Sequence, residues 1–151
     1  MIFKQCEQVL DGTKTQTRRP VKEREQLISG DVGRPIWVHA GGHSAATCKV
    51  IGPGARFVTG KTYAIQPGRG KKAVGRIRIT KIRRQELQGI MPLDIMAEGI
   101  EPIRVTPNRF MAEVRLEDFA QLWDSIYRKP YRWEDNPDVW VLEFEKGPGR
   151  Q

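Results

Sequence analysis

The apolar residues of this chain change their spacing along the sequence, and that change is the strongest constraint on its fold. In residues 116–127 they recur at helical spacing, as on a helix with one buried face. Alternation of apolar and polar residues replaces this spacing in residues 73–82 and 139–145, which is typical of strands. Strands near the middle and helices toward the ends predict the α+β class. Three side chains of the last strand are expected to point into the core: Trp140, Leu142 and Phe144.

Length and composition agree with one domain. The chain has 151 residues, enough for a single core, and we expect a domain over residues 1–146 followed by a flexible tail over 147–151. Its apolar runs are shorter than the roughly 18 residues of a membrane span, which predicts no membrane partner. Two cysteines are too few for a disulfide framework and favour a reduced, cytoplasmic setting. We also expect a monomer without a cofactor.

Shorter elements are predicted around these segments. A helix over residues 1–11 is expected to end at Gly12, since glycine often ends a helix. Residues 11–20 are polar, lack helical spacing and are interpreted as a loop. Residues 62–82 contain two strand-like runs joined by a Pro/Gly segment, which predicts a hairpin. A short helix is expected over residues 92–98.

Charge is distributed unevenly along the chain. The formal net charge is +8, but residues 12–84 carry 17 Lys and Arg against three acidic residues, whereas residues 85–145 carry six against 13. A basic part joined to an acidic part predicts a surface that attracts anions such as nucleic acid. A solvated basic surface without a partner is the alternative.

The segment Gly12–Pro20, GTKTQTRRP, combines basic side chains with threonine hydroxyls. Such a segment offers hydrogen-bond donors to a phosphate or to a base edge. The like charges of Arg18 and Arg19 lower the pKa of the Lys14 ammonium. A neutral lysine can take the proton of a hydroxyl such as that of Thr17. An ordinary solvated basic turn is the alternative interpretation.

Two further segments are candidates for contacts with nucleic acid. The Pro67–Lys72 turn, PGRGKK, is expected at the hairpin tip and lacks the pattern of a phosphate-binding P-loop. Tyr131 and Trp133 lie in a polar loop, where an aromatic ring can stack on a base. The alternative for the Pro67–Lys72 turn is an ordinary solvated turn. The alternative for Tyr131 and Trp133 is packing in the core or at its rim. Together with Lys14, six residues are expected to form a concave, positively charged surface: Arg18, Arg19, Arg69, Lys71, Lys72 and Arg76.

His39 and His43, with Cys48 downstream, are side chains of the kinds that bind zinc. Two glycines between the histidines disfavour a helix, no glutamate occupies the metalloprotease position, and no further ligand is near. A surface loop is therefore preferred, and no metal site is predicted. The sequence assigns no role to the surrounding Gly30–Arg56 segment.

The pattern Gly12-x-Lys14-x-x-Thr17-x-Arg19 resembles the G-x-K-x-x-E-x-R signature of the ASCH family, relatives of the PUA RNA-binding domain. The segments GKTYAIQPGRGKKAVGRIRITKI and DIMAEGI look like the central strand pair and short helix of that family. FAQLWDSIY and YRWEDNPDVWVLEF look like the closing helix and strand of its phage and prophage branch. The resemblance covers nearly the whole chain apart from Gly30–Arg56. It implies a PUA-like domain with a small mixed β-barrel flanked by helices, and RNA or a modified nucleoside as the partner.

Thr17 takes the position of the consensus glutamate, as it does in the branch that hydrolyses N4-acetylcytidine. The resemblance implies that Thr17 attacks the amide carbonyl, Lys14 takes its proton and Glu98 helps protonate the leaving amine. The phage-type branch carries the same threonine without an assigned activity. Three functions are therefore left open: an amidohydrolase or, less favoured, a ribonuclease; a non-catalytic RNA-binding module; and a protein-interaction accessory with a basic face.

Overall fold

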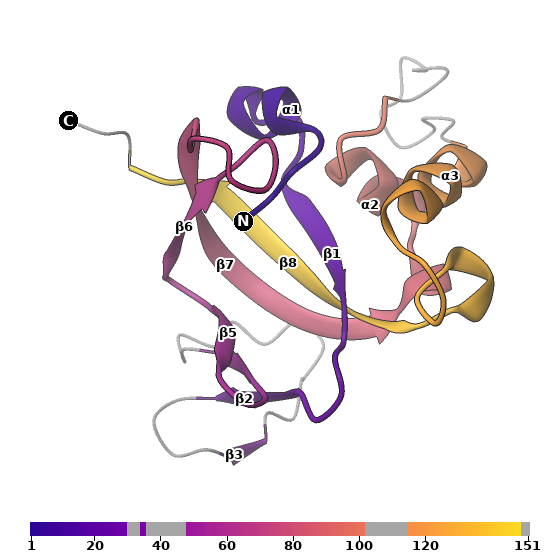
Figure 1. Cartoon of the computed structure of the whole chain (residues 1–151), viewed down its shortest axis with the longest axis horizontal. Helices are drawn as coiled ribbons and strands as arrows, with labels where there is room; N and C mark the ends of the chain where they lie inside the picture. Colours follow the sequence, from indigo (N-terminus) through magenta and orange to yellow (C-terminus); the bar gives the residue numbers. More distant parts are fainter. Residues whose placement is uncertain (30–33, 36–47, 102–114, 149–151) are drawn as a thin grey trace.

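A computed structural model of the chain describes residues 1–29, 34–35, 48–101 and 115–148 (Figure 1). The helices are α1 (Cys6–Asp11), α2 (Pro92–Ala97) and α3 (Leu116–Ile126), with short 3₁₀ helices η2 (Leu87–Gly89) and η4 (Trp133–Asp135). The strands are β1 (Gln16–Pro20), β2 (Gln26–Ser29), β3 (Arg34–Pro35), β4 (Cys48–Ile51), β5 (Ala55–Val58), β6 (Thr62–Ile65), β7 (Gly75–Glu86) and β8 (Asp138–Lys146). The α+β class is therefore confirmed.

The long strands β7 and β8 form the centre of a first sheet, which has the order β1-β8-β7-β6 and antiparallel pairing throughout. The register of β7 shifts between Ile79 and Lys81. Side chains alternate between the two faces of a strand, so this bulge brings Ile82 onto the same face as Ile79. Both isoleucines then pack into the core with Trp140 and Leu142. The hairpin predicted over residues 62–82 is confirmed as the β6–β7 pair.

Strand β8 is buried on both faces. The predicted burial of Trp140, Leu142 and Phe144 is confirmed, since none is more than 6% exposed. Val139 and Val141, on the other face, are fully buried as well, because the helical part of the chain covers that face. Simple alternation of apolar and polar residues therefore describes only one side of this strand.

Helices α2 and α3 lie together on one side of the first sheet (Figure 1). Phe119 and Trp123 of α3 pack against Ile95 of α2 and against Val139 and Val141 of β8. The helical spacing over residues 116–127 thus predicted α3 correctly. The N-terminal segment and α1 cover part of the other face, where Phe3 and Phe144 bring their ring centroids to 5.7 Å.

The second sheet has the order β3-β2-β4-β5, again with antiparallel pairs. Val50 and Phe57 of this sheet pack against Trp140. The Glu25 carboxylate strengthens the junction, because its Oε1 accepts hydrogen bonds from Arg56 Nη1 at 3.0 Å and from Trp140 Nε1 at 3.2 Å. Among the described strands the two sheets remain separate, and no closed barrel is seen.

The predicted loop over residues 11–20 is wrong in its second half, because Gln16–Pro20 forms strand β1. This segment has no alternation of apolar residues, and its strand conformation depends on pairing with β8. The zinc candidates His39 and His43 lie outside the described residues. No helix in the described part of the chain is long and apolar enough to cross a membrane.

Candidate functional site

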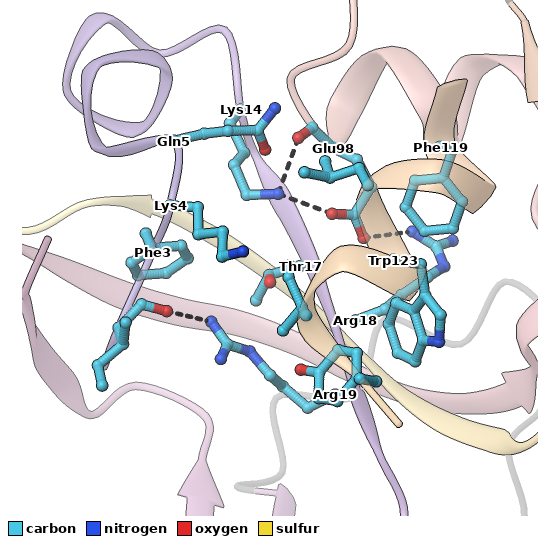
Figure 2. A pocket seen from close by; sticks show the side chains of 14 residues that line it. Phe3, Lys4, Gln5, Lys14, Thr17, Arg18, Arg19, Glu98, Phe119 and Trp123 are labelled. Carbon is cyan, nitrogen blue, oxygen red and sulfur yellow. Dashed lines mark hydrogen bonds and ion pairs between the residues drawn. The ribbon is translucent and has the colours of Figure 1, made fainter. Parts of the chain in front are cut away.

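A pocket of about 130 Å³ lies where four parts of the chain meet (Figure 2). These parts are the N-terminal segment before α1, the segment from Lys14 to Arg19, the residue after α2, and one face of α3 with the residue that follows it. Its charged or polar lining includes Lys4, Gln5, Lys14, Thr17, Arg18, Arg19 and Glu98, and its apolar walls include Phe3, Phe119 and Trp123. Segments that are far apart in the sequence therefore build one site.

Strand β1 contributes neighbouring residues to the pocket, although neighbours in a strand point to opposite faces. Thr17 and Arg19 lie on the face that carries Trp140, according to their register with β8. Arg18 lies on the face that carries Val141. Because β1 is the outermost strand of its sheet, the pocket extends around the strand edge and receives side chains from both faces.

The loop before β1 is fixed at both ends. Gly12 ends α1 with φ of 85°, a left-handed conformation that glycine adopts without steric cost. The Lys14 N–H donates to the Gln8 carbonyl at 2.9 Å, and the Thr15 N–H donates to the Ala97 carbonyl at 2.8 Å. These bonds hold the loop between α1 and the end of α2, and they direct the Lys14 side chain toward Glu98.

Lys14 and Glu98 form a buried ion pair. The ammonium Nζ donates to Glu98 Oε2 at 2.7 Å and to the Glu98 carbonyl oxygen at 2.8 Å, and both side chains are only 6% exposed. Gly99 follows with φ of 92°, and a Cβ at this position would lie 3.2 Å from the Lys14 Cβ. Glycine at position 99 thus permits both the turn after α2 and the close approach of Lys14.

Arg18 binds the other oxygen of the same carboxylate. Its Nη1 donates to Glu98 Oε1 at 3.0 Å and to Gln16 Oε1 at 3.1 Å. Its Nη2 lies 3.6 Å from Asp94 Oδ2, beyond hydrogen-bond distance. The Glu98 carboxylate therefore binds two buried cations, one through each of its oxygens.

Burial lowers the pKa of the Lys14 ammonium below its usual 10.5, because an enclosed site disfavours the charged form. The Glu98 carboxylate opposes this shift by its charge and its hydrogen bond, whereas the positive charges of Arg19 and Arg18 add to it. The sequence predicted the effect of the two arginines, but burial is the larger cause. Lys14 is consequently easier to deprotonate than an exposed lysine.

The Thr17 hydroxyl has no hydrogen-bond partner within the part of the chain that the structure describes. The residue is 5% exposed and lines the pocket, and Figure 2 shows its side chain between those of Lys14 and Arg19 in this view. The hydroxyl keeps its full capacity to donate and to accept hydrogen bonds. It is available to a ligand that enters the pocket.

Aromatic side chains of α3 form one wall of the pocket. Phe119, Trp123 and Tyr127 follow one another at intervals of four residues, and the Trp123 and Tyr127 ring centroids are 4.2 Å apart. Burial raises the pKa of the Tyr127 hydroxyl, and the charge of Arg19 opposes this effect. The sequence predicted these residues as the buried face of a helix, but that spacing does not distinguish a core face from a pocket wall.

Tyr131 and Trp133, the predicted stacking residues, do not line this pocket. Trp133 packs edge-on against Phe119, with ring centroids 6.1 Å apart, and its backbone N–H donates to Asp124 Oδ1 at 2.8 Å. The Tyr131 carbonyl accepts a 2.6 Å bond from Trp123 Nε1. The two residues support the aromatic wall from behind.

The predicted basic residues occupy two different places. Lys14 and Arg18 are buried and paired with Glu98, so they are not part of an open basic surface. Arg76 is exposed and donates to Thr62 Oγ1 at 3.1 Å. Arg69, Lys71 and Lys72 are exposed at the β6–β7 turn and do not line the pocket. Lys14 and Arg18 thus belong to a buried ion-paired site, whereas Arg69, Lys71, Lys72 and Arg76 are exposed.

Among the described residues, no group of three or more His, Cys, Asp or Glu side chains is placed to hold a metal ion. Compared with known protein families, with curated proteins and with solved structures, this chain matches none of them. The geometry of the pocket is therefore the basis for assigning a function.

Proposed function

We propose that this chain is an amidohydrolase of the ASCH type, which removes the acyl group from N4-acylated cytidine. The observation that carries the proposal is the buried Lys14–Glu98 pair in one pocket with the unpaired Thr17 hydroxyl. Nucleophilic catalysis needs a hydroxyl, a base to take its proton and an acid to protonate the leaving group. These three kinds of group line the same cavity.

In the proposed reaction, the Lys14–Glu98 pair accepts a proton and then returns it in each of two steps. Thr17 Oγ forms a bond to the acyl carbonyl carbon, and its proton passes to a neutral Lys14 Nζ. The C–N4 bond then breaks, and N4 receives a proton from the Lys14–Glu98 pair, which releases cytidine. Water attacks the acyl-threonine ester and gives up a proton to the same pair, which frees the carboxylic acid and restores the hydroxyl. No external oxidant or cofactor is required.

The pocket has dimensions that suit a single ring. An engineered apolar cavity of roughly 150 Å³ takes one benzene molecule, and this pocket measures about 130 Å³. The aromatic rings of Phe119 and Trp123 offer flat surfaces to a base. A pyrimidine with a small acyl group is therefore a better match than a purine with a large one.

The position of the motif supports the ASCH assignment. Lys14, Thr17 and Arg19 of the signature all line the pocket, as does Glu98 from the DIMAEGI segment. The PUA-like fold with a small barrel is part of the same proposal, as is a monomer in the cytoplasm. RNA contacts at the exposed Arg69–Lys72 turn are a further part of the proposal.

The experiment incubates the wild type with a panel of N4-acylcytidines and short RNAs that contain them, with products identified by mass spectrometry. Thr17→Ala should abolish release of the acid, whereas Thr17→Ser should retain part of the activity because it keeps a hydroxyl. Thr15→Ala is the matched control, since Thr15 is exposed in the same segment. If Thr17→Ala is as active as the wild type, Thr17 is not the nucleophile. Binding without turnover would instead favour the RNA-binding module.

A further inference from the structure

Arg18 carries a pair of unsatisfied donors. Its side chain is fully buried, yet its Nε and Nη2 form no hydrogen bond to any described residue. The N–H bonds of these two atoms run parallel along one edge of the guanidinium, the edge that binds two acceptors at once. Buried donors without partners cost free energy in the folded protein. This edge is therefore suited to a ligand with two adjacent acceptor atoms.

Two carboxylates and the aromatic wall of the pocket lie around Arg18. The positive charge of Arg18 already faces Glu98 at 3.0 Å and Asp94 at 3.6 Å. A further carboxylate or phosphate at this place would meet two negative charges. Figure 2 shows the guanidinium beside Glu98 and close to Phe119 and Trp123 in this view. A flat ring with acceptors in its plane fits both the fork and the aromatic walls.

We propose that Arg18 is a specificity residue that recognises the O2 and N3 atoms of a cytosine base. This inference rests on the proposed function and names the part of the substrate that the pocket reads. Cytosine and its N4-acyl derivatives present O2 and N3 as neighbouring acceptors, which matches the two parallel N–H bonds of Nε and Nη2. Arg18 thereby places the base, and the acyl group on N4 is left to face Thr17.

The same contact excludes other bases. An N6-acylated adenine has the ring acceptor N1, but its neighbour is a C–H group, so one donor of the fork would remain unpaired. Uracil has a donor at N3, which would face the guanidinium donors directly. A site built to satisfy buried donors rejects ligands that leave them unpaired. The pocket should therefore distinguish acylated cytidine from acylated adenosine although both carry the same amide.

The test compares cytosine with 4-aminopyrimidine, which lacks the O2 atom and the hydrogen on N1 but keeps N3 and the amino group, by isothermal titration calorimetry. Wild-type protein should bind cytosine roughly tenfold or more tightly, the value of a lost bond to a charged donor. Arg18→Lys keeps the charge but removes the fork, so this difference should vanish. Arg83→Lys is the matched control, because Arg83 contacts the same Asp94 at 3.4 Å but lies outside the pocket lining.

Equal affinities in the wild type, or a difference that persists in Arg18→Lys, would overturn the inference, as would failure of both compounds to bind. Tighter binding of benzoate than of cytosine would also overturn it, because the fork would then be a carboxylate site. If Arg18→Lys does not fold, the two affinities of the wild type still decide. Neither compound carries an N4-acyl group, so binding is measured without hydrolysis, and failure of this inference can be told apart from failure of the proposed function.

Discussion

The Lys14 ammonium and the Glu98 carboxylate lie 2.7 Å apart although 84 positions separate them in the sequence. The pair joins the loop before β1 to the end of α2, and it is closed off from solvent on both sides. Glu98 also accepts a hydrogen bond from Arg18 through its other carboxylate oxygen. The pocket thus contains two buried cations held by one anion, and this arrangement determines its response to substitution and to pH.

Glu98→Gln should destabilise the protein by about 3–5 kcal/mol, the cost of removing one partner of a buried ion pair. Lys14 would then face a neutral amide, and Arg18 would keep only the Asp94 carboxylate at 3.6 Å. Lys14→Met should cost less, because Arg18 still balances the carboxylate. Urea unfolding followed by circular dichroism gives both free energies of unfolding. The reverse order would show that Arg18 does not compensate Glu98.

The contribution of Lys14 to stability should increase with pH. Its pKa in the folded protein lies below the usual 10.5, so between these two values the unfolded chain binds more protons. The free energy of unfolding therefore rises with pH in that window. Urea unfolding of the wild type and Lys14→Met between pH 7 and 9.5 should give a difference that grows in favour of the wild type. A difference that shrinks with pH would contradict the lowered pKa.

Hydrolysis should also accelerate as pH rises. Lys14 accepts the proton of Thr17 only as a neutral amine, and burial moves the appearance of that form below pH 10.5. The ratio kcat/KM for N4-acetylcytidine should rise through a midpoint below this value. Lys14→Arg retains its charge at every pH of the experiment and should show low activity without such a rise. An unchanged profile in Lys14→Arg would exclude Lys14 as the base.

Gly99→Ala should destabilise the protein by roughly 1–2 kcal/mol, the cost of a left-handed conformation in a residue with a Cβ. The new methyl group would also press on the Lys14 Cβ, 3.2 Å away, so catalysis should fall with stability. Gly89→Ala is the comparison, because a Cβ there meets no atom within 4 Å. Thermal unfolding and kcat measured on both variants separate strain at position 99 from a general effect of glycine replacement.

Replacing Arg69, Lys71 and Lys72 together by glutamine should weaken binding of short RNAs regardless of their sequence. The salt dependence should become less steep, by about 0.7 in the logarithmic slope for each single-strand phosphate contact that is lost. Fluorescence anisotropy at several salt concentrations measures both effects. Arg128→Gln with Lys129→Gln removes charge elsewhere and serves as the control. Equal slopes in wild type and tip variant would mean that this turn does not contact RNA.

The parts of the fold that sequence could predict are those with apolar periodicity. Helix α3 and the strands β7 and β8 follow from regular spacing of apolar side chains that face the core. Strand β1 has buried polar residues at Gln16, Thr17 and Arg18, so no hydrophobic pattern marks it. Its conformation comes from pairing with β8, a contact between the two ends of the chain that local sequence does not encode.

The candidate site was predictable only in part. Lys14 and Thr17 lie three positions apart in a segment that combines basic and hydroxyl side chains, although composition alone favours a solvated turn there. No spacing rule connects them to Glu98, whose place in the site was predicted from the family resemblance alone. The aromatic wall was missed as a site feature, because Trp123 has the same helical spacing as a core residue. The unpaired edge of Arg18 is a property of the packed structure, and sequence offers no signal for it.

The outer strands of the first sheet are both anchored to other parts of the chain. Beyond β6, Gln66 exchanges backbone hydrogen bonds with Met1 and Phe3, and just before β1 the Thr15 N–H bonds to Ala97. A bare sheet edge offers unpaired N–H and C=O groups to strands of other molecules. These backbone hydrogen bonds therefore affect the tendency of the protein to aggregate as well as the shape of the sheet. A variant that loosens either one exposes a template for intermolecular β-pairing, and concentrated solutions are where this aggregation would first be seen.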